Sequence, residues 1–376
     1  MKKRIISVLL STAMVAAIVA GCGNKTEDAK TQAGTAAQST GESAEAGGSS
    51  KIGVAMPTKD LQRWNQDGEN MKNELESAGY EVDLQFANNE IGTLVSQLEN
   101  MITGGCGALV VASIDGTALS EVLDKAKDAG IPVIAYDRLI MNTDAVSYYA
   151  TFDNYKVGQM QGQYIEEKLD LKNQDGPFNI ELFTGSSDDN NCNFFFGGAM
   201  DVLQPYIDEG KLIIQSGTEP TLAACATPNW STEEAQKRMD NLITKSYSGD
   251  QKLDAVLSSN DSVANGITNA LLAAGYTADN FPVITGQDCD ITSVQNIIKG
   301  TQAMSIFKDT RELASQVVKM VDAIMNGEEP EVNDTESYDN GTGVIPTYLC
   351  DPVFADKDNY KELLIDSGYY TEDQLQ

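Results

Sequence analysis

Short apolar runs alternate with helix-like segments along most of this chain, and this alternation restricts its fold more than any other feature. The segments between the runs carry apolar residues at helical spacing. In a first series, we predict strands at 52–56, 80–86, 108–112 and 131–135. A second series follows residues 147–151, with strands expected at 179–183, 211–215, 253–257 and 282–285. Repeated strand–helix–strand units predict an α/β fold of two doubly wound lobes, each a mostly parallel sheet with helices on both faces.

The last part of the chain is too small for a third domain. It contains a predicted strand at 302–307, a strongly apolar helix face near 313–324, a run at 343–349 and a short helix near 360–364. We expect these elements to complete the two lobes, with 51–152 plus 289–342 forming the N-terminal lobe and 153–288 plus 343–376 the C-terminal lobe. Since the chain then crosses between the lobes more than once, the sequence predicts a hinge of several strands.

The N-terminus has the features of a lipoprotein export signal. Residues 1–21 combine a basic start with an apolar core that is short for a membrane span. They end at Val19-Ala20-Gly21-Cys22, which resembles the bacterial lipobox and implies lipidation of Cys22; a plain signal peptide or a membrane anchor is the alternative. Of the 28 residues at 23–50, 19 are Gly, Ala, Ser or Thr, so 22–50 is predicted to be a flexible tether. We therefore expect an extracytoplasmic protein, lipid-anchored to the outer face of the bacterial cytoplasmic membrane.

Composition excludes several classes of function. The chain has no histidine, which rules out Ser-His-Asp and Cys-His nucleophile systems. Its six cysteines contain no Cys-x-x-Cys pair, so we expect no zinc site, and no Gly-x-Gly-x-x-Gly motif follows a predicted strand. The net charge of −30 repels nucleic acid and anionic membranes. We expect neither a cofactor nor a metal, and no nucleic-acid partner.

Polar residues follow the predicted strands, where ligands bind in open α/β sheets. Asp137 and Arg138 come directly after 131–135, and a carboxylate beside a guanidinium suits a polyhydroxylated ligand. A salt bridge that caps the strand is the alternative. Arg63 and Trp64 follow the first strand, where the indole could cover a sugar face. The alternative for this pair is an ion pair at a helix start beside a core aromatic.

Several stretches of the chain resemble one known family. They include Val133-Ile-Ala-Tyr-Asp-Arg138, Tyr149-Ala-Thr-Phe-Asp-Asn154 and Gly368-Tyr-Tyr-Thr-Glu-Asp-Gln374, together with 55–59, 63–64, 96–102, 185–191, 259–261, 286–288 and 306–310. From residue 51 to residue 376 the chain resembles the type I periplasmic sugar-binding proteins of ABC transporters, in the multiple-sugar and xylose-binding group. The lipobox and tether depart from the many family members that are freely soluble.

The resemblance implies roles for particular residues. Asp137 and Arg138 match a pair that holds sugar hydroxyls, and Trp230 matches a second stacking aromatic. Asn260 and Asp288 match positions that hydrogen-bond the sugar.

Other candidates from the same resemblance have open alternatives. In the loop 188–191, Asn190 and Asn191 are favoured over the adjacent acids, which more often face solvent. Lys308 matches a position that reaches the sugar, but it could pair with Asp309 instead. The remaining candidates are Asp153 and Asn154, which could cap a helix, Asp261, which could cap the helix after it, and Gln287.

The resemblance implies a binding protein rather than an enzyme. We expect a monomer that closes two lobes around a monosaccharide, an aldose such as xylose, glucose or galactose, and delivers it to the membrane permease of an ABC importer. One alternative is a sugar sensor subunit that docks on a chemoreceptor or histidine kinase. Another is a glycoside hydrolase, which would need two carboxylates flanking the glycosidic bond.

Overall fold

The computed structural model describes residues 50–249 and 251–376. The predicted signal peptide at 1–21, the lipidation site Cys22 and the tether up to residue 49 lie outside the described residues. Within the described ranges, no helix combines the length and the apolar character needed to cross a membrane.

The first lobe is built on a six-stranded sheet in which all neighbouring strands are parallel. The order across the sheet is β11-β5-β4-β3-β1-β2. The strands are β1 (Lys51–Met56), β2 (Glu81–Phe86), β3 (Ala108–Val111), β4 (Val133–Tyr136), β5 (Val146–Phe152) and β11 (Thr347–Cys350).

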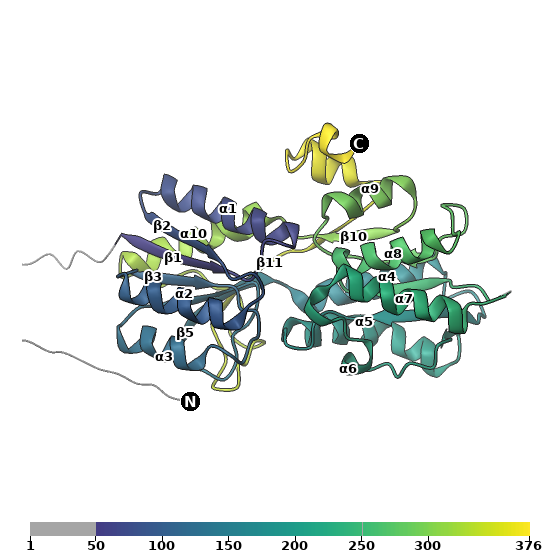
Figure 1. Cartoon of the computed structure of the whole chain (residues 1–376), viewed down its shortest axis with the longest axis horizontal. Helices are drawn as coiled ribbons and strands as arrows, with labels where there is room; N and C mark the ends of the chain where they lie inside the picture. Colours follow the sequence, from purple (N-terminus) through teal and green to yellow (C-terminus); the bar gives the residue numbers. More distant parts are fainter. Residues whose placement is uncertain (1–49, 250) are drawn as a thin grey trace, which may run out of the picture. The chain divides into compact units, whose positions relative to one another are not determined.

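Helices cover both faces of this sheet (Figure 1). They are α1 (Gln62–Ser77), α2 (Ile91–Thr103), α3 (Ser120–Asp128) and α10 (Thr310–Met325). Apolar residues of α2 and α3 pack on one face, and those of α1 and α10 pack on the other. The central strands β3 and β4 are therefore buried on both faces, as their continuous apolar runs predict.

The second lobe has a comparable sheet made of two parts. Four parallel strands lie in the order β7-β6-β8-β9, and a bridge between Gln287 and Ile306 joins them to the antiparallel pair β10-β12. The strands are β6 (Phe178–Phe183), β7 (Leu212–Ile214), β8 (Ala255–Ser258), β9 (Val283–Ile284), β10 (Met304–Phe307) and β12 (Val353–Asp356).

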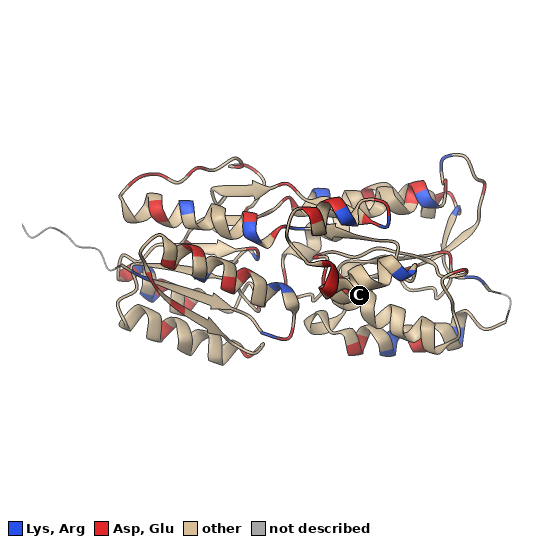
Figure 2. Cartoon of the chain, turned by 90° about the horizontal axis from the view of Figure 1, so that it is seen from above, with Lys and Arg blue, Asp and Glu red and all other residues tan. Residues whose placement is uncertain are grey.

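Six of the described α-helices belong to the second lobe. They are α4 (Asn154–Lys168), α5 (Asn191–Asp208), α6 (Leu222–Cys225), α7 (Thr232–Ser246), α8 (Asp261–Ala273) and α9 (Ile291–Lys299), with the short turns η1 (Pro228–Trp230), η2 (Lys361–Asp366) and η3 (Glu372–Leu375). Where α4 meets α5, a Cβ on Gly158 would lie 2.0 Å from the carbonyl oxygen of Phe195, so only glycine permits this approach. Acidic and basic residues lie on the helices of both lobes (Figure 2).

The chain crosses between the lobes three times, after β5, after β10 and after β11. These crossings divide residues 289–376 between the lobes in another way than predicted, since we expected 289–342 in the N-terminal lobe and 343–376 in the C-terminal lobe. The segment with α9 and β10 belongs to the second lobe, because Ile306 bridges to Gln287 and β10 pairs with β12. The later strand β11 returns to the first lobe, because it pairs with β5. An apolar run fits the edge of either sheet, so the pattern alone did not select between them.

Candidate functional site

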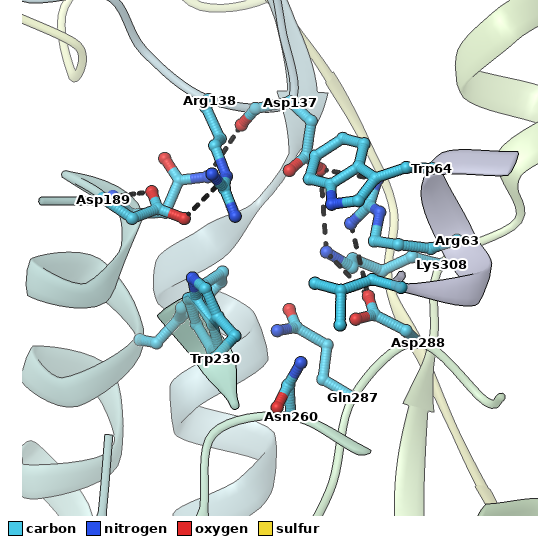
Figure 3. Close-up of a pocket in the computed structure, with 13 residues that line it drawn as sticks. Arg63, Trp64, Asp137, Arg138, Asp189, Trp230, Asn260, Gln287, Asp288 and Lys308 are labelled. Atoms are coloured by element: carbon cyan, nitrogen blue, oxygen red, sulfur yellow. Dashed lines mark hydrogen bonds and ion pairs between the residues drawn. The ribbon is translucent and has the colours of Figure 1, made fainter. Parts of the chain in front are cut away.

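Side chains from both lobes surround one cavity at the carboxyl ends of the strands (Figure 3). The space between the lining atoms, including its opening to solvent, measures about 300 Å³. The first lobe contributes the region after β1 and the residues after β4, and the second contributes residues after β6, β8 and β9. The lining residues are Leu61, Arg63, Trp64, Asp137, Arg138, Asp189, Asn191, Phe195, Trp230, Asn260, Gln287, Asp288 and Lys308.

A buried ion cluster occupies one side of the cavity. Arg63 Nη2 lies 2.9 Å from Asp137 Oδ2, and Arg63 Nη1 lies 3.3 Å from Asp288 Oδ1. Lys308 Nζ lies 3.6 Å from Asp137 and 3.1 Å from Asp288. Arg63 comes from the first lobe and Asp288 from the second, so the cluster joins the lobes across the cleft.

The cations keep Asp137 ionised. Burial alone would raise the pKa of this carboxyl, but the neighbouring cations outweigh burial, led by Arg63 and then Lys308, and lower the pKa below its ordinary value of 3.8. Asp137 Oδ2 is ion-paired, yet it accepts no hydrogen bond of good geometry from the described residues. A charged acceptor is therefore available to a hydroxyl donor in the cavity.

Asp67 holds Arg63 in place from behind. Its Oδ2 accepts hydrogen bonds from Arg63 Nε at 3.0 Å and Nη2 at 2.9 Å, and its Oδ1 accepts one from Tyr136 at 2.5 Å. The carboxylate is fully buried, and burial raises its pKa to about 6 in spite of Arg63. The guanidinium is thus fixed by a residue that does not line the cavity.

A second ion pair crosses the cleft at another corner of the cavity. Arg138 Nε lies 2.9 Å from Asp189 Oδ2, while Arg138 Nη1 donates to the carbonyl oxygen of Ser113 at 3.0 Å. Burial raises the pKa of Asp189, and Arg138 offsets only part of this effect. The guanidinium carbons of Arg63 and Arg138 lie 4.5 and 5.1 Å from the ring centre of Trp64, so this indole makes cation–π contacts with both arginines.

Besides Asp189 and Asp288, the second lobe supplies three amides to the cavity. Asn260 Oδ1 accepts from Val263 N at the start of α8, and its amide nitrogen points into the cavity in Figure 3. Gln287 Nε2 donates to the carbonyl oxygen of Ser259 at 3.2 Å. Asn191 Nδ2 donates to the backbone carbonyl of Asp137 at 2.7 Å, which ties the start of α5 to the first lobe.

Trp230 forms an aromatic wall opposite the ion cluster. Its ring lies flat on the backbone of Gly185, where a Cβ would come within 2.1 Å of the ring, and Phe195 packs against it edge-on at 6.4 Å. The indole nitrogens of Trp230 and Trp64 and the Oε1 of Gln287 are buried without a hydrogen-bond partner among the described residues. Buried polar groups in native proteins nearly always have partners, so these atoms point to a polar ligand.

Three of the cavity residues have strained backbone conformations. Asp137, Trp230 and Asp288 have φ values of 58°, 56° and 99°, in the left-handed region that side chains other than glycine rarely adopt. Such strain clusters at functional sites, where surrounding contacts hold the backbone in place.

Ten of the predicted site residues line the cavity, and the structure places the other four outside it. Asp153 caps α4 by accepting from Lys156 N, and Asn154 is buried beside Thr151 and Tyr149. Asn190 accepts from the side chain of Asn193. These polar groups make their hydrogen bonds within a local turn or the hinge and not in the cavity.

Asp261 is the fourth predicted residue outside the cavity. It is buried behind the strand ends, where it accepts from Ser305 Oγ, Gln302 Nε2 and the backbone nitrogen of Asp290. Burial, with the neighbouring acids, raises the pKa of this carboxyl well above its ordinary value. Its contacts are those of a structural residue of the second lobe.

The structure also adds cavity residues that the sequence did not indicate. Asp189 is buried and paired with Arg138, contrary to the expectation that the two adjacent acids face solvent; only Asp188 does so. Phe195 lies in an apolar run, and Leu61 is a single apolar residue between polar neighbours, so neither indicated a site. Lys308 faces the cavity, and Asp309 pairs with Arg311 instead. Among the described residues, no cluster of acidic or cysteine side chains could hold a metal ion.

Comparison with known proteins identifies the family. The protein-family model described as "Periplasmic binding protein domain" matches residues 52–329 of this chain. This chain belongs to the periplasmic binding proteins. The predicted α/β architecture of two parallel-sheet lobes is confirmed, and a periplasmic binding protein is a binding protein rather than an enzyme.

Relatives of this periplasmic binding protein cover nearly all of the described residues. It is 53% identical to the multiple sugar-binding periplasmic receptor ChvE of Rhizobium radiobacter, over 86% of this chain and 92% of the relative. It is 36% identical to the D-xylose-binding periplasmic protein of Escherichia coli, with the same coverage.

Solved structures of similar proteins include two with bound sugar. An ABC transporter solute binding protein of Clostridium phytofermentans with bound β-D-glucose is 65% identical, with a TM-score of 0.85, over 87% of this chain and all of that chain. A carbohydrate transporter solute binding protein of Chloroflexus aurantiacus in complex with D-glucose is 34% identical, with a TM-score of 0.78, over 86% and 97%.

Proposed function

We propose that this protein captures a monosaccharide, an aldopyranose such as D-glucose, between its two lobes outside the cytoplasmic membrane. The observation that carries the proposal is the cavity itself, where a compensated ion cluster and two tryptophans from different lobes face one small space. A pyranose presents hydroxyls that both donate and accept, together with apolar C–H faces. Carboxylates and guanidinium groups suit the hydroxyls, and indole rings suit the faces.

The charge balance of the cavity favours a neutral ligand. Each of its three cations, Arg63, Arg138 and Lys308, already lies within ion-pair distance of a carboxylate. An anion would have to displace one of these carboxylates, at the cost of leaving a buried charge unpaired. A sugar hydroxyl can instead donate to Asp137 without disturbing its ion pairs.

Both lobes contribute to the cavity, so a ligand that contacts both stabilises the closed form. We infer that the protein delivers the sugar as a monomer to the permease of an ABC importer, in keeping with the transporters for which the two similar sugar-bound proteins are named. Loss of the protein should then reduce cellular uptake of the labelled sugar, while uptake of an unrelated amino acid should not change.

A thermal-shift screen of the full chain tests the proposed ligand class. D-glucose, D-xylose and D-galactose are each added to purified protein, with sucrose as the control. A ligand at a hundredfold excess over its dissociation constant stabilises the folded state by about 2.7 kcal/mol, which gives a clear increase in Tm. We expect at least one aldose to raise Tm and sucrose to leave it unchanged. No stabilisation by any aldose would refute the proposal.

We also propose that Cys22 is lipidated and anchors the protein to the outer face of the cytoplasmic membrane. The basis is the sequence Val19-Ala20-Gly21-Cys22 after a basic and apolar leader. In cells, the wild-type protein should fractionate with membranes and incorporate labelled fatty acid. Cys22→Ser should abolish both, whereas the same change at the buried Cys106 should leave both intact. Membrane association of Cys22→Ser would contradict the anchor.

A further inference from the structure

The chain ends in a segment that contacts both lobes at their junction. Tyr370 is 3% exposed and packs in an apolar cluster of the second lobe with Cys289 and Phe307. In Figure 1 this terminal segment lies next to α9 and faces α1 of the first lobe. The stretch 368–374 resembled the sugar-binding family at the level of sequence, but none of its residues lines the cavity.

Hydrogen bonds connect this segment to α1. Gln62 Nε2 donates to Tyr370 Oη at 2.6 Å, and that hydroxyl donates in turn to the carbonyl oxygen of Cys289 at 2.9 Å. One turn further along α1, Gln66 Oε1 accepts from Tyr369 Oη at 3.3 Å. We refer to Gln62, Gln66, Tyr369 and Tyr370 as the clasp.

A further bond joins the clasp to the start of α9. Gln62 Oε1 accepts from the backbone nitrogen of Ile291 at 3.1 Å. Ile291 is the first residue of α9, and the first N–H groups of a helix have no partner within the helix. The first lobe thus supplies an acceptor that the second lobe lacks, and this bond exists only while the lobes are together.

The clasp and the cavity share one helix. Gln62 and Gln66 are four residues apart, so they lie on the same face of α1, while Arg63 and Trp64 of its first turn face the cavity. Since α1 moves as a unit, contacts that hold its clasp face to the second lobe also hold Arg63 near Asp288.

We propose that the clasp determines the sugar affinity by stabilising the closed form without touching the sugar, an inference that rests on the proposed function. A ligand that binds the closed form has an apparent affinity that scales with the population of that form. A hydrogen bond contributes about 1 kcal/mol net, which corresponds to about a fivefold change in affinity. Opening of the cleft breaks the clasp. Loss of the clasp should therefore raise the rate of sugar release.

A double-mutant cycle on the full chain tests this coupling. D-glucose binding is followed by stopped-flow fluorescence of the two tryptophans, Trp64 and Trp230, both of which line the cavity. Tyr370→Phe should raise koff and Kd about fivefold, and Gln62→Ala should raise them further because it also removes the acceptor of Ile291 N, with kon nearly unchanged in both. The effect of the double variant should be smaller than the product of the two single effects, because both changes remove the bond between Gln62 and Tyr370. Multiplied effects, or single variants with wild-type koff, would overturn the proposal.

Tyr360→Phe is the matched control, since it removes a tyrosine hydroxyl from the same C-terminal region outside the clasp. It should leave koff unchanged, and thermal unfolding should show each variant folded.

A measurement without sugar separates failure of the clasp from failure of the proposed function. Hydrogen exchange of the Ile291 amide reports how often the lobes separate, because its acceptor lies on the other lobe. Exchange should be about fivefold faster in Tyr370→Phe than in wild type or Tyr360→Phe. Unchanged exchange in Tyr370→Phe would overturn the clasp. If exchange responds but wild type binds no aldose, the clasp stands as a lobe contact and the ligand assignment fails.

Discussion

The two halves of the cleft are built in different ways. The first-lobe half is charged, and its key cation is fixed before any ligand arrives, because Asp67, which accepts from Tyr136, also accepts from Arg63 inside the lobe. The second-lobe half adds two acids, Asp189 and Asp288, and also presents amides and an indole that are positioned by the backbone: Asn260 caps α8 and Trp230 lies on Gly185.

This difference indicates how the two halves divide the work of binding. The first lobe provides a fixed electrostatic frame, whose ion pairs orient the hydroxyls of a sugar. The second lobe completes the frame with Asp189 and Asp288, each paired with an arginine of the opposite lobe, and adds the apolar wall. Substitutions of the ion-paired residues of either half should therefore disturb charge balance, whereas substitution of the indole of the second half should mainly remove contact area.

The largest expected effect comes from Asp137→Asn in the charged half. The change keeps the shape of the side chain but leaves Arg63 and Lys308 short of a buried counter-charge. Loss of one partner of a buried charge pair costs about 2–5 kcal/mol, so D-glucose affinity should fall about 100-fold or more by isothermal titration calorimetry. Asp144→Asn, which removes an exposed carboxylate from the same lobe, should bind as wild type. Equal affinities for both variants would argue against a charged frame.

Trp230→Ala should have the next largest effect, from the opposite half. Removing the indole deletes a contact surface in the core of the site, for which about 2 kcal/mol, or a 30-fold loss of affinity, is expected. Trp230→Phe keeps an aromatic face and should retain most of the affinity in the same titration. If the phenylalanine variant lost as much as the alanine variant, the ring would not be acting as a stacking surface.

Asp189→Asn should weaken binding about tenfold, by breaking the ion pair with Arg138 across the cleft. The effect is smaller than at Asp137, since Arg138 keeps its bond to the carbonyl oxygen of Ser113. The adjacent, exposed Asp188 offers a matched control, and Asp188→Asn should have no effect. If calorimetry gives Asp189→Asn and Asp188→Asn the same affinity for D-glucose, the assignment of Asp189 to the site is wrong.

Asp67→Asn should have the smallest effect on sugar affinity but a clear effect on the pH dependence of stability. The folded-state pKa of Asp67, about 6, lies above its ordinary value of 3.8, so the folded protein binds this proton more tightly than the unfolded chain. The stability that results is fully present below about pH 4 and is lost as the pH rises to about 6.

Asparagine does not titrate, so the variant lacks this contribution. Urea unfolding should show the stability of wild type falling relative to Asp67→Asn between about pH 4 and about pH 6, and a constant difference above that range. A difference that is the same at every pH would show that Asp67 does not titrate in this window.

The fold and much of the site could be predicted from strand ends. Asp137, Asn260 and Asp288 each follow a predicted strand, and parallel sheets bring such residues to one edge. The prediction for the tail is right for α10 and β12 but wrong for α9, β10 and β11. The pairing of β10 with β12 and of β11 with β5 depends on contacts between residues far apart in sequence.

The remaining differences between the predicted and the observed site arise from the directions in which side chains point. Asn190 and Asn191 are adjacent, but only Asn191 turns toward the cavity. Asp67 carried no signal, because a carboxylate one turn after Arg63 is common on helix surfaces, and only the packing of α1 on the sheet shows that it is buried.

The central claim is that one neutral sugar is held by both halves of the cleft at once. A crystal structure of the full chain grown with D-glucose tests this most directly. We predict a single pyranose in the cavity, with its ring packed on Trp230 and with hydroxyls within hydrogen-bond distance of Asp137 from the first lobe and Asn260 from the second. A sugar that contacts only one lobe, or that is ordered outside the cavity, would contradict the account.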